Sequence, residues 1–399
     1  MTARRGRLLV DATALAAPRL TGVGRVLLGL LRALDADEIA ERVDVQLVVP
    51  ASEARVLERF GFRTLRLRPV PLPRLLWSAL TRLPAPGIDL LLGRGTYFFP
   101  NFRRWPLTRS RSLTFVHDVC FAVLPDLVPQ ERRQLLARSV SRWIGRSDLV
   151  LTGTPSSAAE VESALGVDPA RVRVLPTTID TELFYSRGDA EVARVRAEHS
   201  LGSYLLFVGS IERRKNLVTL VDAYRLADRP GGHTLLLVGA DGWDNEDVHA
   251  AVTRAVEAGA DVRFASAYVP DDDLPALLTG ADAVAMPSWH EGFGLPALEA
   301  VACGTPVLAA DIPGLRDALA GREDDAVFTA PGDRAAWTVA IEQALRSPRR
   351  VAARPIPGWN VGARQLLALA FAFEEPNPRR RRDNRRAAPR AGKGEKERR

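Results

Sequence analysis

Short apolar runs alternate along this chain with longer stretches in which apolar residues recur every three or four positions. The short runs predict strands buried on both faces, and the periodic stretches predict amphipathic helices. Such alternation is typical of βαβ units and parallel sheets. A first set of predicted strands is Leu8–Val10, Val43–Val49, Thr64–Leu67, Leu90–Leu92, Ser112–Val116, Leu149–Leu151 and Val172–Val174. A second set is Tyr204–Val208, Thr234–Val238, Val262–Phe264, Ala283–Met286, Pro306–Ala309 and Ala326–Phe328.

Helices are predicted over Gly24–Leu34, Leu72–Leu83 and Gln130–Ile144, between strands of the first set. Residues 184–200 are charged and poor in bulky apolar side chains, which favours a linker that runs into a short helix. A last apolar block, Val361–Phe373, follows a Pro-Ile-Pro-Gly break and predicts a terminal helix.

The expected fold class is therefore α/β, with two doubly wound, Rossmann-like domains that face each other across a cleft. We place the first domain at residues 1–186 and the second at 200–352. Residues 353–375 form a helix that returns toward the first domain, and residues 376–399 form a tail. Ligands of open parallel sheets bind beyond the carboxyl ends of the strands, so residues that follow strands are the candidates for chemistry.

Composition limits the class of protein. The chain has 399 residues and 46% apolar residues, enough for two hydrophobic cores. It has no run of about 18 apolar residues that would span a membrane, and its first ten residues lead into a strand pattern without a signal-peptide core. The two cysteines, Cys120 and Cys303, cannot form a disulfide framework or a metal cluster, and a reducing cytoplasm is the natural interpretation.

The net charge of +7 belongs to the tail. Residues 376–399 hold eleven Lys or Arg and three Asp or Glu, so the remaining residues sum to −1. A Pro/Arg/Gly tail of this kind cannot bury a core and is expected to be disordered. It could touch anionic lipid or nucleic acid, but a solvated tail is the preferred interpretation, and we expect no nucleic-acid partner.

Lysine use singles out one position. Of 55 basic residues only three are lysines, and Lys215 is the one outside the tail. It lies in the segment Val208-Gly-Ser-Ile-Glu-Arg-Arg-Lys-Asn216, at the end of a predicted strand. Three consecutive cations there need partners, and a diphosphate is a suitable one. The alternative is a surface basic turn before a helix.

The run from His290 to Ala300, His-Glu-Gly-Phe-Gly-Leu-Pro-Ala-Leu-Glu-Ala, is the strongest motif. Glu291 and Glu299 flank a glycine turn, and their eight-residue spacing lets both acids face one ligand. The turn would present backbone N–H groups at a helix start, which suits a phosphate or a polyol. The alternative is that the two acids pair with Arg316 or Arg322, which leaves the glycines unexplained.

Two motifs of the first domain also follow strands. Thr21-Gly22-Val23-Gly24-Arg25 opens the first helix, where glycines allow close approach of a phosphate, but it lacks the third glycine of a dinucleotide fingerprint. His117 and Asp118 end a strand, where a histidine can donate a hydrogen bond or act as a general acid or base. The other histidines, including His290, have no such context.

Two further segments remain open. The aromatic stretch Gly95–Pro100 fits either an acceptor platform or core packing. The predicted helix Leu72–Leu83, with Arg74, Trp77 and Arg82, is amphipathic enough to lie on a membrane, although an ordinary surface helix is preferred.

Together these motifs resemble those of the retaining nucleotide-sugar glycosyltransferases of family 4, a large GT-B group that includes bacterial mannosyl- and glucosyltransferases of polysaccharide assembly. The likeness covers residues 8 to about 373. Further matching segments are Val269-Pro270-Asp271, Ala281-Asp282-Ala283, Pro287-Ser288 and Ala302-Cys303-Gly304-Thr305-Pro306-Val307.

The resemblance implies roles for individual residues. It implies contacts to the diphosphate from Gly22, Gly24, Arg214 and Lys215. It implies that Glu291 orients the donor sugar, with backbone amides from Phe293, Gly294 and Leu295, and that Glu299 holds the ribose hydroxyls. It places His117, followed by Asp118, near the donor sugar. Ser210 stands where the family often has arginine, which puts one phosphate contact in doubt and makes Arg213 a candidate substitute; Thr177-Thr178-Ile179 replaces a common Asn-Gly-Val.

The implied activity is transfer of a hexose, with a preference for mannose, from a nucleoside diphosphate sugar to a glycan or lipid-linked acceptor, with the anomeric configuration retained. We see no Asp-x-Asp-type site placed to hold a cation at the donor diphosphate, so we expect no metal and no cofactor besides the donor co-substrate. A cytoplasmic protein with peripheral contact at the inner face of the plasma membrane is implied. Alternatives are a GT-B epimerase or phosphorylase and a non-catalytic, nucleotide-sugar-binding scaffold; for a phosphorylase, Lys215 would be the only candidate pyridoxal lysine.

Overall fold

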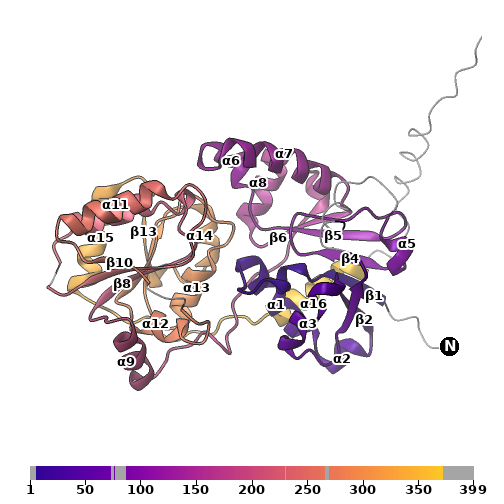
Figure 1. The fold of residues 1–399 in the computed structure, drawn as a ribbon, viewed down its shortest axis with the longest axis horizontal. Coiled ribbons are helices and arrows are strands. Elements are labelled where there is room, and N and C mark those ends of the chain that lie inside the picture. The colour runs from indigo at the N-terminus through magenta and orange to yellow at the C-terminus, as the bar shows by residue number, and fades with distance from the viewer. Residues whose placement is uncertain (1–5, 73–75, 77–86, 230, 266–268, 372–399) are drawn as a thin grey trace, which may run out of the picture.

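The computed structural model describes residues 6–72, 76, 87–229, 231–265 and 269–371. Within these ranges the chain forms two parallel sheets with helices packed on them, each sheet in its own lobe (Figure 1). The first sheet has the strand order β3-β2-β1-β4-β5-β6-β7, and the second has the order β10-β9-β8-β11-β12-β13. This confirms the predicted α/β class with two Rossmann-like domains. We call the first sheet with its helices the first lobe and the second sheet with its helices the second lobe.

The strands are short and mostly buried, as expected for sheets covered on both faces. Those of the first sheet are β1 (Gly6–Asp11), β2 (Val43–Pro50), β3 (Arg66–Val70), β4 (Thr96–Phe99), β5 (Arg111–Val116), β6 (Leu149–Thr152) and β7 (Val172–Val174). Those of the second sheet are β8 (Tyr204–Val208), β9 (Thr234–Val238), β10 (Val262–Phe264), β11 (Ala283–Met286), β12 (Val307–Ala310) and β13 (Ala326–Thr329).

Helices connect the strands. The first lobe contains α1 (Gly22–Leu34), α2 (Asp37–Ala40), α3 (Ala54–Leu57), α5 (Asp89–Leu92), α6 (Cys120–Val123), α7 (Gln130–Gly145) and α8 (Pro155–Leu165). The second lobe contains α9 (Asp189–Glu198), α10 (Leu217–Leu226), α11 (Glu246–Glu257), α12 (Leu274–Gly280), α13 (Leu295–Ala302), α14 (Pro313–Ala318) and α15 (Arg334–Arg346). The last helix is α16 (Asn360–Phe371).

The prediction of a strand at Leu90–Leu92 is wrong, because this segment lies in the helical turn α5. The Asp89 carboxylate accepts hydrogen bonds from the backbone N–H groups of Thr108 and Arg109, both at 2.7 Å, and so fixes the start of the turn. Leu90 and Leu91 are exposed rather than part of a buried strand. Three adjacent leucines carry no period that separates a helix from a strand.

The place of that strand in the sheet is taken by β4, which lies in the aromatic stretch. Tyr97, Phe98 and Phe99 are each no more than 1% exposed, and the Phe99 ring meets Trp105 edge to face at 5.3 Å. The stretch therefore packs in the core, and its interpretation as an acceptor platform is wrong.

Strand β3 begins two residues later than predicted. The Asp35 carboxylate, just after α1, accepts hydrogen bonds from the backbone N–H groups of Arg63, Thr64 and Leu65. These bonds hold the residues in a turn, so the ladder with β2 starts at Arg66.

The terminal helix α16 returns to the first lobe. It packs against α1, and Ala363, Leu366 and Ala370 are buried in the core of the first lobe (Figure 1). The chain therefore crosses between the lobes twice, once after β7 and once before α16. The two crossings touch each other, since Thr178 Oγ1 donates to the Pro357 carbonyl at 2.7 Å.

Two predictions concern residues outside the described ranges. They are the helix at Leu72–Leu83, of which only positions 72 and 76 are described, and the tail at 376–399. In the described part of the chain, no helix is long and apolar enough to cross a membrane.

Candidate functional site

The loop after β8 positions the cations of the second lobe. The segment Arg213–Lys215 forms one 3-10 turn, and Asn216 follows in the left-handed conformation with φ 55°. The Asn216 side-chain amide donates to the carbonyls of Pro287 at 3.0 Å and Pro331 at 2.8 Å. Asparagine tolerates the left-handed region better than most residues, and here it also ties the loop to the segments that follow β11 and β13.

Glu291 is the centre of a buried cluster of charges. Its Oε1 accepts hydrogen bonds from Lys215 Nζ and Ser288 Oγ, each at 2.6 Å. Its Oε2 lies 3.3 Å from Arg214 Nη1, which also donates to the His290 carbonyl at 2.8 Å. Glu291 and Lys215 come from segments 76 positions apart and are brought together by adjacent strands of the sheet.

Neighbouring charges and hydrogen bonds together have a larger effect on the pKa of Glu291 than burial has. Burial alone would raise the pKa of Glu291, but the charges of Lys215 and Arg214 and the hydrogen bonds from Lys215 and Ser288 lower it to about 2. The carboxylate is therefore ionised at neutral pH. Arg214 has a second carboxylate partner in Glu212, at 2.7 Å. Arg213 instead points away, is half exposed and pairs with Asp244 at 3.6 Å.

The glycine turn between the two acids fits tightly against both lobes. Gly294 has φ 89°, in the left-handed region that favours glycine, and starts α13. A Cβ at Gly292 would collide with the backbone carbonyl of His117 in the first lobe. The backbone at Phe293, Gly294 and Leu295 lies at the helix start, where N–H groups have no preceding turn to accept their hydrogen bonds.

Glu299 lies in α13 and is only 4% exposed. Its ion-pair partner is Arg25 of α1, whose Nη1 is 3.6 Å from Glu299 Oε1, too far for a hydrogen bond. Burial raises the pKa of Glu299 to about 7, although the charge of Arg25 acts in the opposite direction. The two acids thus share a motif but differ in electrostatic state. The alternative pairing with Arg316 and Arg322 is wrong, since these arginines pair with Asp311 and Asp325.

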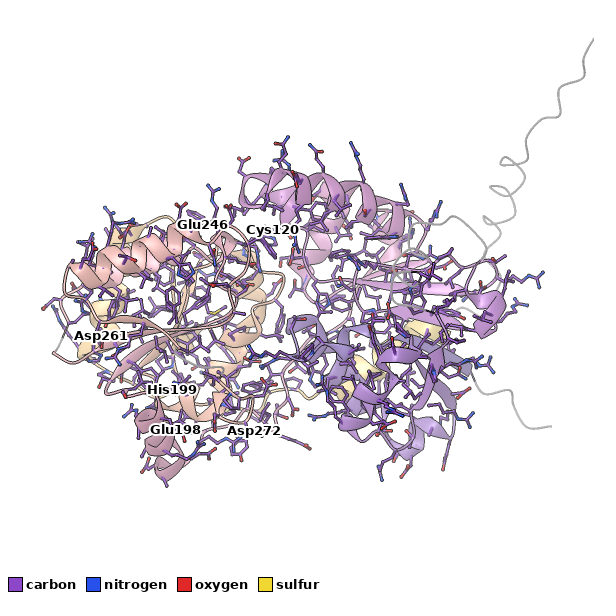
Figure 2. All side chains as sticks on the ribbon, viewed as in Figure 1. Cys120, Glu198, His199, Glu246, Asp261 and Asp272 are labelled. Carbon is purple, nitrogen blue, oxygen red and sulfur yellow. The ribbon has the colours of Figure 1, made fainter. Side chains whose placement is uncertain are left out.

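The first-lobe residues lie opposite this turn. His117 and Asp118 follow β5; His117 Nε2 is 2.8 Å from the Pro100 carbonyl, and burial lowers the pKa of the imidazole. Burial would raise the pKa of Asp118, but the charges of Arg214 and His290 in the second lobe lower it. Figure 2 labels Cys120, two residues further on, at the edge of the first lobe that faces the second.

Gly22 and Gly24 differ in the space that surrounds each glycine. Gly22 starts α1, and the nearest neighbour of a Cβ there would be Leu295 of the second lobe at 4.0 Å, so the position is open toward α13. A Cβ at Gly24 would lie 3.2 Å from the Ala14 carbonyl and 3.0 Å from Leu20. The absence of a side chain at Gly24 thus serves packing within the first lobe.

Contacts between the lobes include residues that the sequence analysis did not select. The Gly292 carbonyl accepts from Thr154 Oγ1 at 3.1 Å and Ser157 Oγ at 2.9 Å, both at the start of α8. His290 Nε2 lies 3.0 Å from Glu160 Oε2 in the same helix. These residues follow a strand or lie on a helix like many others, and no local pattern distinguishes them.

The cluster holds cations beside buried carboxylates at a helix start, an arrangement suited to binding an anionic ligand that carries hydroxyls. Among the described residues, no group of three or more His, Cys, Asp or Glu is placed to hold a metal ion. Both cysteines are buried and free.

Comparisons with known proteins agree with this geometry. Residues 20–183 match the family Glycosyltransferase Family 4, and residues 193–356 match Glycosyl transferases group 1. The chain is 34% identical over 273 residues to the 2-deoxystreptamine glucosyltransferase of Streptomyces kanamyceticus, covering 65% of this chain and 69% of that protein. It is 30% identical over 254 residues to the O-antigen chain mannosyltransferase B of Escherichia coli, covering 63% of this chain and 65% of that protein.

The fold is also similar to that of a solved structure, Anabaena HepE in complex with UDP-glucose. The TM-score is 0.60 at 17% identity, over 92% of this chain and 96% of that one. The chain belongs to the GT-B glycosyltransferases, with a family-4 segment in the first lobe and a group-1 segment in the second.

Proposed function

We propose that this protein is a retaining, metal-independent hexosyltransferase that moves a hexose, preferably mannose, from a nucleoside diphosphate sugar to a glycan or lipid-linked hydroxyl. The observation that carries the proposal is the buried Lys215–Glu291–Arg214 cluster at the start of α13. The name of the Escherichia coli relative supports a mannosyl donor, and the HepE complex with UDP-glucose supports a nucleotide sugar.

In the proposed reaction, the bond between the anomeric carbon and the diphosphate breaks, and a bond from that carbon to the acceptor oxygen forms on the same face. The acceptor proton passes to the departing phosphate oxygen. Negative charge grows on the diphosphate, and Arg214 and Lys215, with the N–H groups at the start of α13, stabilise it by fixed electrostatics. Glu291 orients the sugar hydroxyls and needs no covalent role.

The test measures donor hydrolysis without acceptor and without added metal, against GDP-, UDP- and ADP-sugars. Slow release of one nucleotide is expected, and it should be lost in Glu291→Ala and Lys215→Ala. Glu198→Gln is a matched control, because Glu198 is an exposed acid paired with Arg194 (labelled in Figure 2). Absence of nucleotide release and of nucleotide binding would favour the scaffold alternative. The anomeric configuration of the product, read by NMR, tests retention.

We propose a cytoplasmic protein with peripheral contact at the inner face of the plasma membrane, as suits a lipid-linked acceptor. Helix α7 supports this proposal, because it exposes Leu135 together with Arg138 and Arg142. Basic side chains around an apolar one favour binding to anionic lipid. Co-sedimentation with phosphatidylglycerol vesicles, compared with phosphatidylcholine vesicles, tests it. A protein that binds to neither kind of vesicle would contradict membrane contact.

A further inference from the structure

Arg25 is a residue of the first lobe whose side chain contacts the group-1 half of the site. Its side chain is 26% exposed and leaves the first turn of α1 toward α13, close to where Gly22 faces Leu295. There it meets two acids of the second lobe, Asp271 and Glu299, and its guanidinium lies 6.0 Å from the Phe184 ring.

The two acids are engaged differently. Arg25 Nη2 donates to Asp271 Oδ1 at 2.6 Å, which is a charge-assisted hydrogen bond and fixes the guanidinium. Nη1 lies 3.6 Å from Glu299 Oε1, which is close enough for attraction between charges but not for a hydrogen bond. The Glu299 lone pairs are therefore not used by Arg25. A bidentate pair would have occupied them.

We propose that Arg25 is a positioning residue that acts through Glu299: its charge favours the anionic form of the buried carboxylate, and in that form Glu299 accepts hydrogen bonds from two neighbouring hydroxyls of the donor nucleotide. This inference rests on the proposed function, because it requires a nucleotide-sugar donor. It makes the second lobe's hydroxyl-binding acid dependent on the charge of a residue of the first lobe.

The groups that face Glu299 support this arrangement. Burial is the largest influence on the pKa of Glu299 and raises it, Asp271 raises it further, and Arg25 lowers it. Cys303, which directly follows the end of α13, stays a neutral thiol because burial raises its pKa to about 12. Removal of Arg25 takes away the cation that counters the burial, so Glu299 should then take up a proton at neutral pH.

The test is the pH dependence of donor affinity between pH 5.5 and 8.5, measured by calorimetry with UDP-glucose and GDP-mannose. Both phosphates of these donors are esterified, so neither donor titrates its diphosphate near neutral pH. Wild-type affinity should fall as the pH drops through about 7. In Arg25→Gln the midpoint should rise by about one pH unit, which weakens binding about tenfold below the wild-type midpoint.

Three variants make the result specific. Arg25→Lys keeps the charge and should restore most of the wild-type midpoint. Glu299→Gln should abolish this pH dependence. Arg32→Gln is the matched control on the same helix, since Arg32 pairs with Asp180 away from the site, and its midpoint should equal that of the wild type.

Each outcome separates the two claims. Wild-type protein that binds none of the GDP-, UDP- and ADP-sugars would overturn the proposed function and this inference with it. If the wild type binds a donor but the midpoint of the pH dependence is unchanged in Arg25→Gln, the inference alone would be overturned. A uniform loss of affinity at every pH in Arg25→Gln would also overturn it, because that result indicates direct contact or altered packing.

Discussion

Glu291 and Glu299 are both buried, stand eight positions apart and flank the same helix start, yet their surroundings differ in kind. Glu291 has two cations of its own lobe and a serine hydroxyl within hydrogen-bond reach, and its pKa falls to about 2. Glu299 has one arginine of the other lobe at 3.6 Å, and its pKa rises to about 7. Burial acts in the same direction on both, so the difference arises from the neighbouring charges.

The contrast separates two uses of a buried acid. Glu291 takes its hydrogen-bond and ion-pair partners from the second lobe alone. Glu299 is held in a state close to its titration point, and its charge depends on the approach of the first lobe. Four substitutions, from the largest expected effect to the smallest, can break or sharpen this contrast.

Glu291→Gln should lower the free energy of unfolding at pH 7 by about 3–5 kcal/mol, because Lys215 and Arg214 would keep buried charges without their main partner. The contribution of wild-type Glu291 is complete above its ordinary pKa of 4.5 and is lost as the pH falls through 2. Urea denaturation from pH 3 to 8 measures it. A variant as stable as the wild type at pH 7 would contradict the network, and Glu198→Gln should change stability by no more than about 0.5 kcal/mol.

Lys215→Ala should reduce hexosyl transfer about 10- to 150-fold, equivalent to about 1.5–3 kcal/mol, through loss of one charged hydrogen bond to the departing diphosphate. Turnover at saturating donor is the measurement. Lys215→Arg, which keeps the charge, is the companion variant and should lose less. Near-normal turnover in Lys215→Ala would remove this lysine from the site.

Glu299→Gln should change stability in the direction opposite to Glu291→Gln. We expect it to raise the free energy of unfolding at pH 8 by about 1–3 kcal/mol. The folded-state pKa of about 7 lies above the ordinary 4.5, so between these two pH values the folded protein binds more protons than the unfolded protein. The free energy of unfolding therefore falls as the pH rises toward and through 7 and Glu299 ionises. The amide stays neutral. The two proteins should be equally stable below about pH 4.5; urea curves at pH 4.5, 6 and 8 check this, and a destabilised variant at pH 8 would refute the contrast.

Ser288→Ala should cost about 1 kcal/mol, because it removes one of the hydrogen bonds to Glu291 while both cations remain. It should also raise the pKa of Glu291, which carboxyl-carbon NMR titration detects. Ser163→Ala is the control, since that exposed hydroxyl bonds only within its own helix. Equal effects of the two substitutions would show that Ser288 has no particular role at the carboxylate.

The sequence sufficed to bring Lys215 and Glu291 together, and both belong to one lobe. Lys215 and Glu291 each follow a strand, and strand ends of a parallel sheet meet at one edge, so their proximity could be predicted. The same rule does not place Arg25 beside Glu299 or His290 beside Glu160, because those pairs depend on how two lobes meet. Arg25, His290 and Glu299 each lie in or beside a motif that the sequence marks, but no local pattern pairs a residue of one lobe with a residue of the other.

Local patterns also failed where side chains of one kind stand in a row. The leucines at Leu90–Leu92 are compatible with a strand or a turn, and the decision falls to Asp89, whose carboxylate binds amides about twenty positions away. Such a contact can be seen only in the folded chain.

The touch between Thr178 and Pro357 has a mechanical meaning. The two segments of the chain that connect the lobes meet at one place and are joined there by this hydrogen bond. Two segments fixed at one point allow rotation about that point but resist sliding and separation. A rotation of one lobe relative to the other would therefore centre on this point, and Arg25 and Glu299 would separate and meet again along one arc.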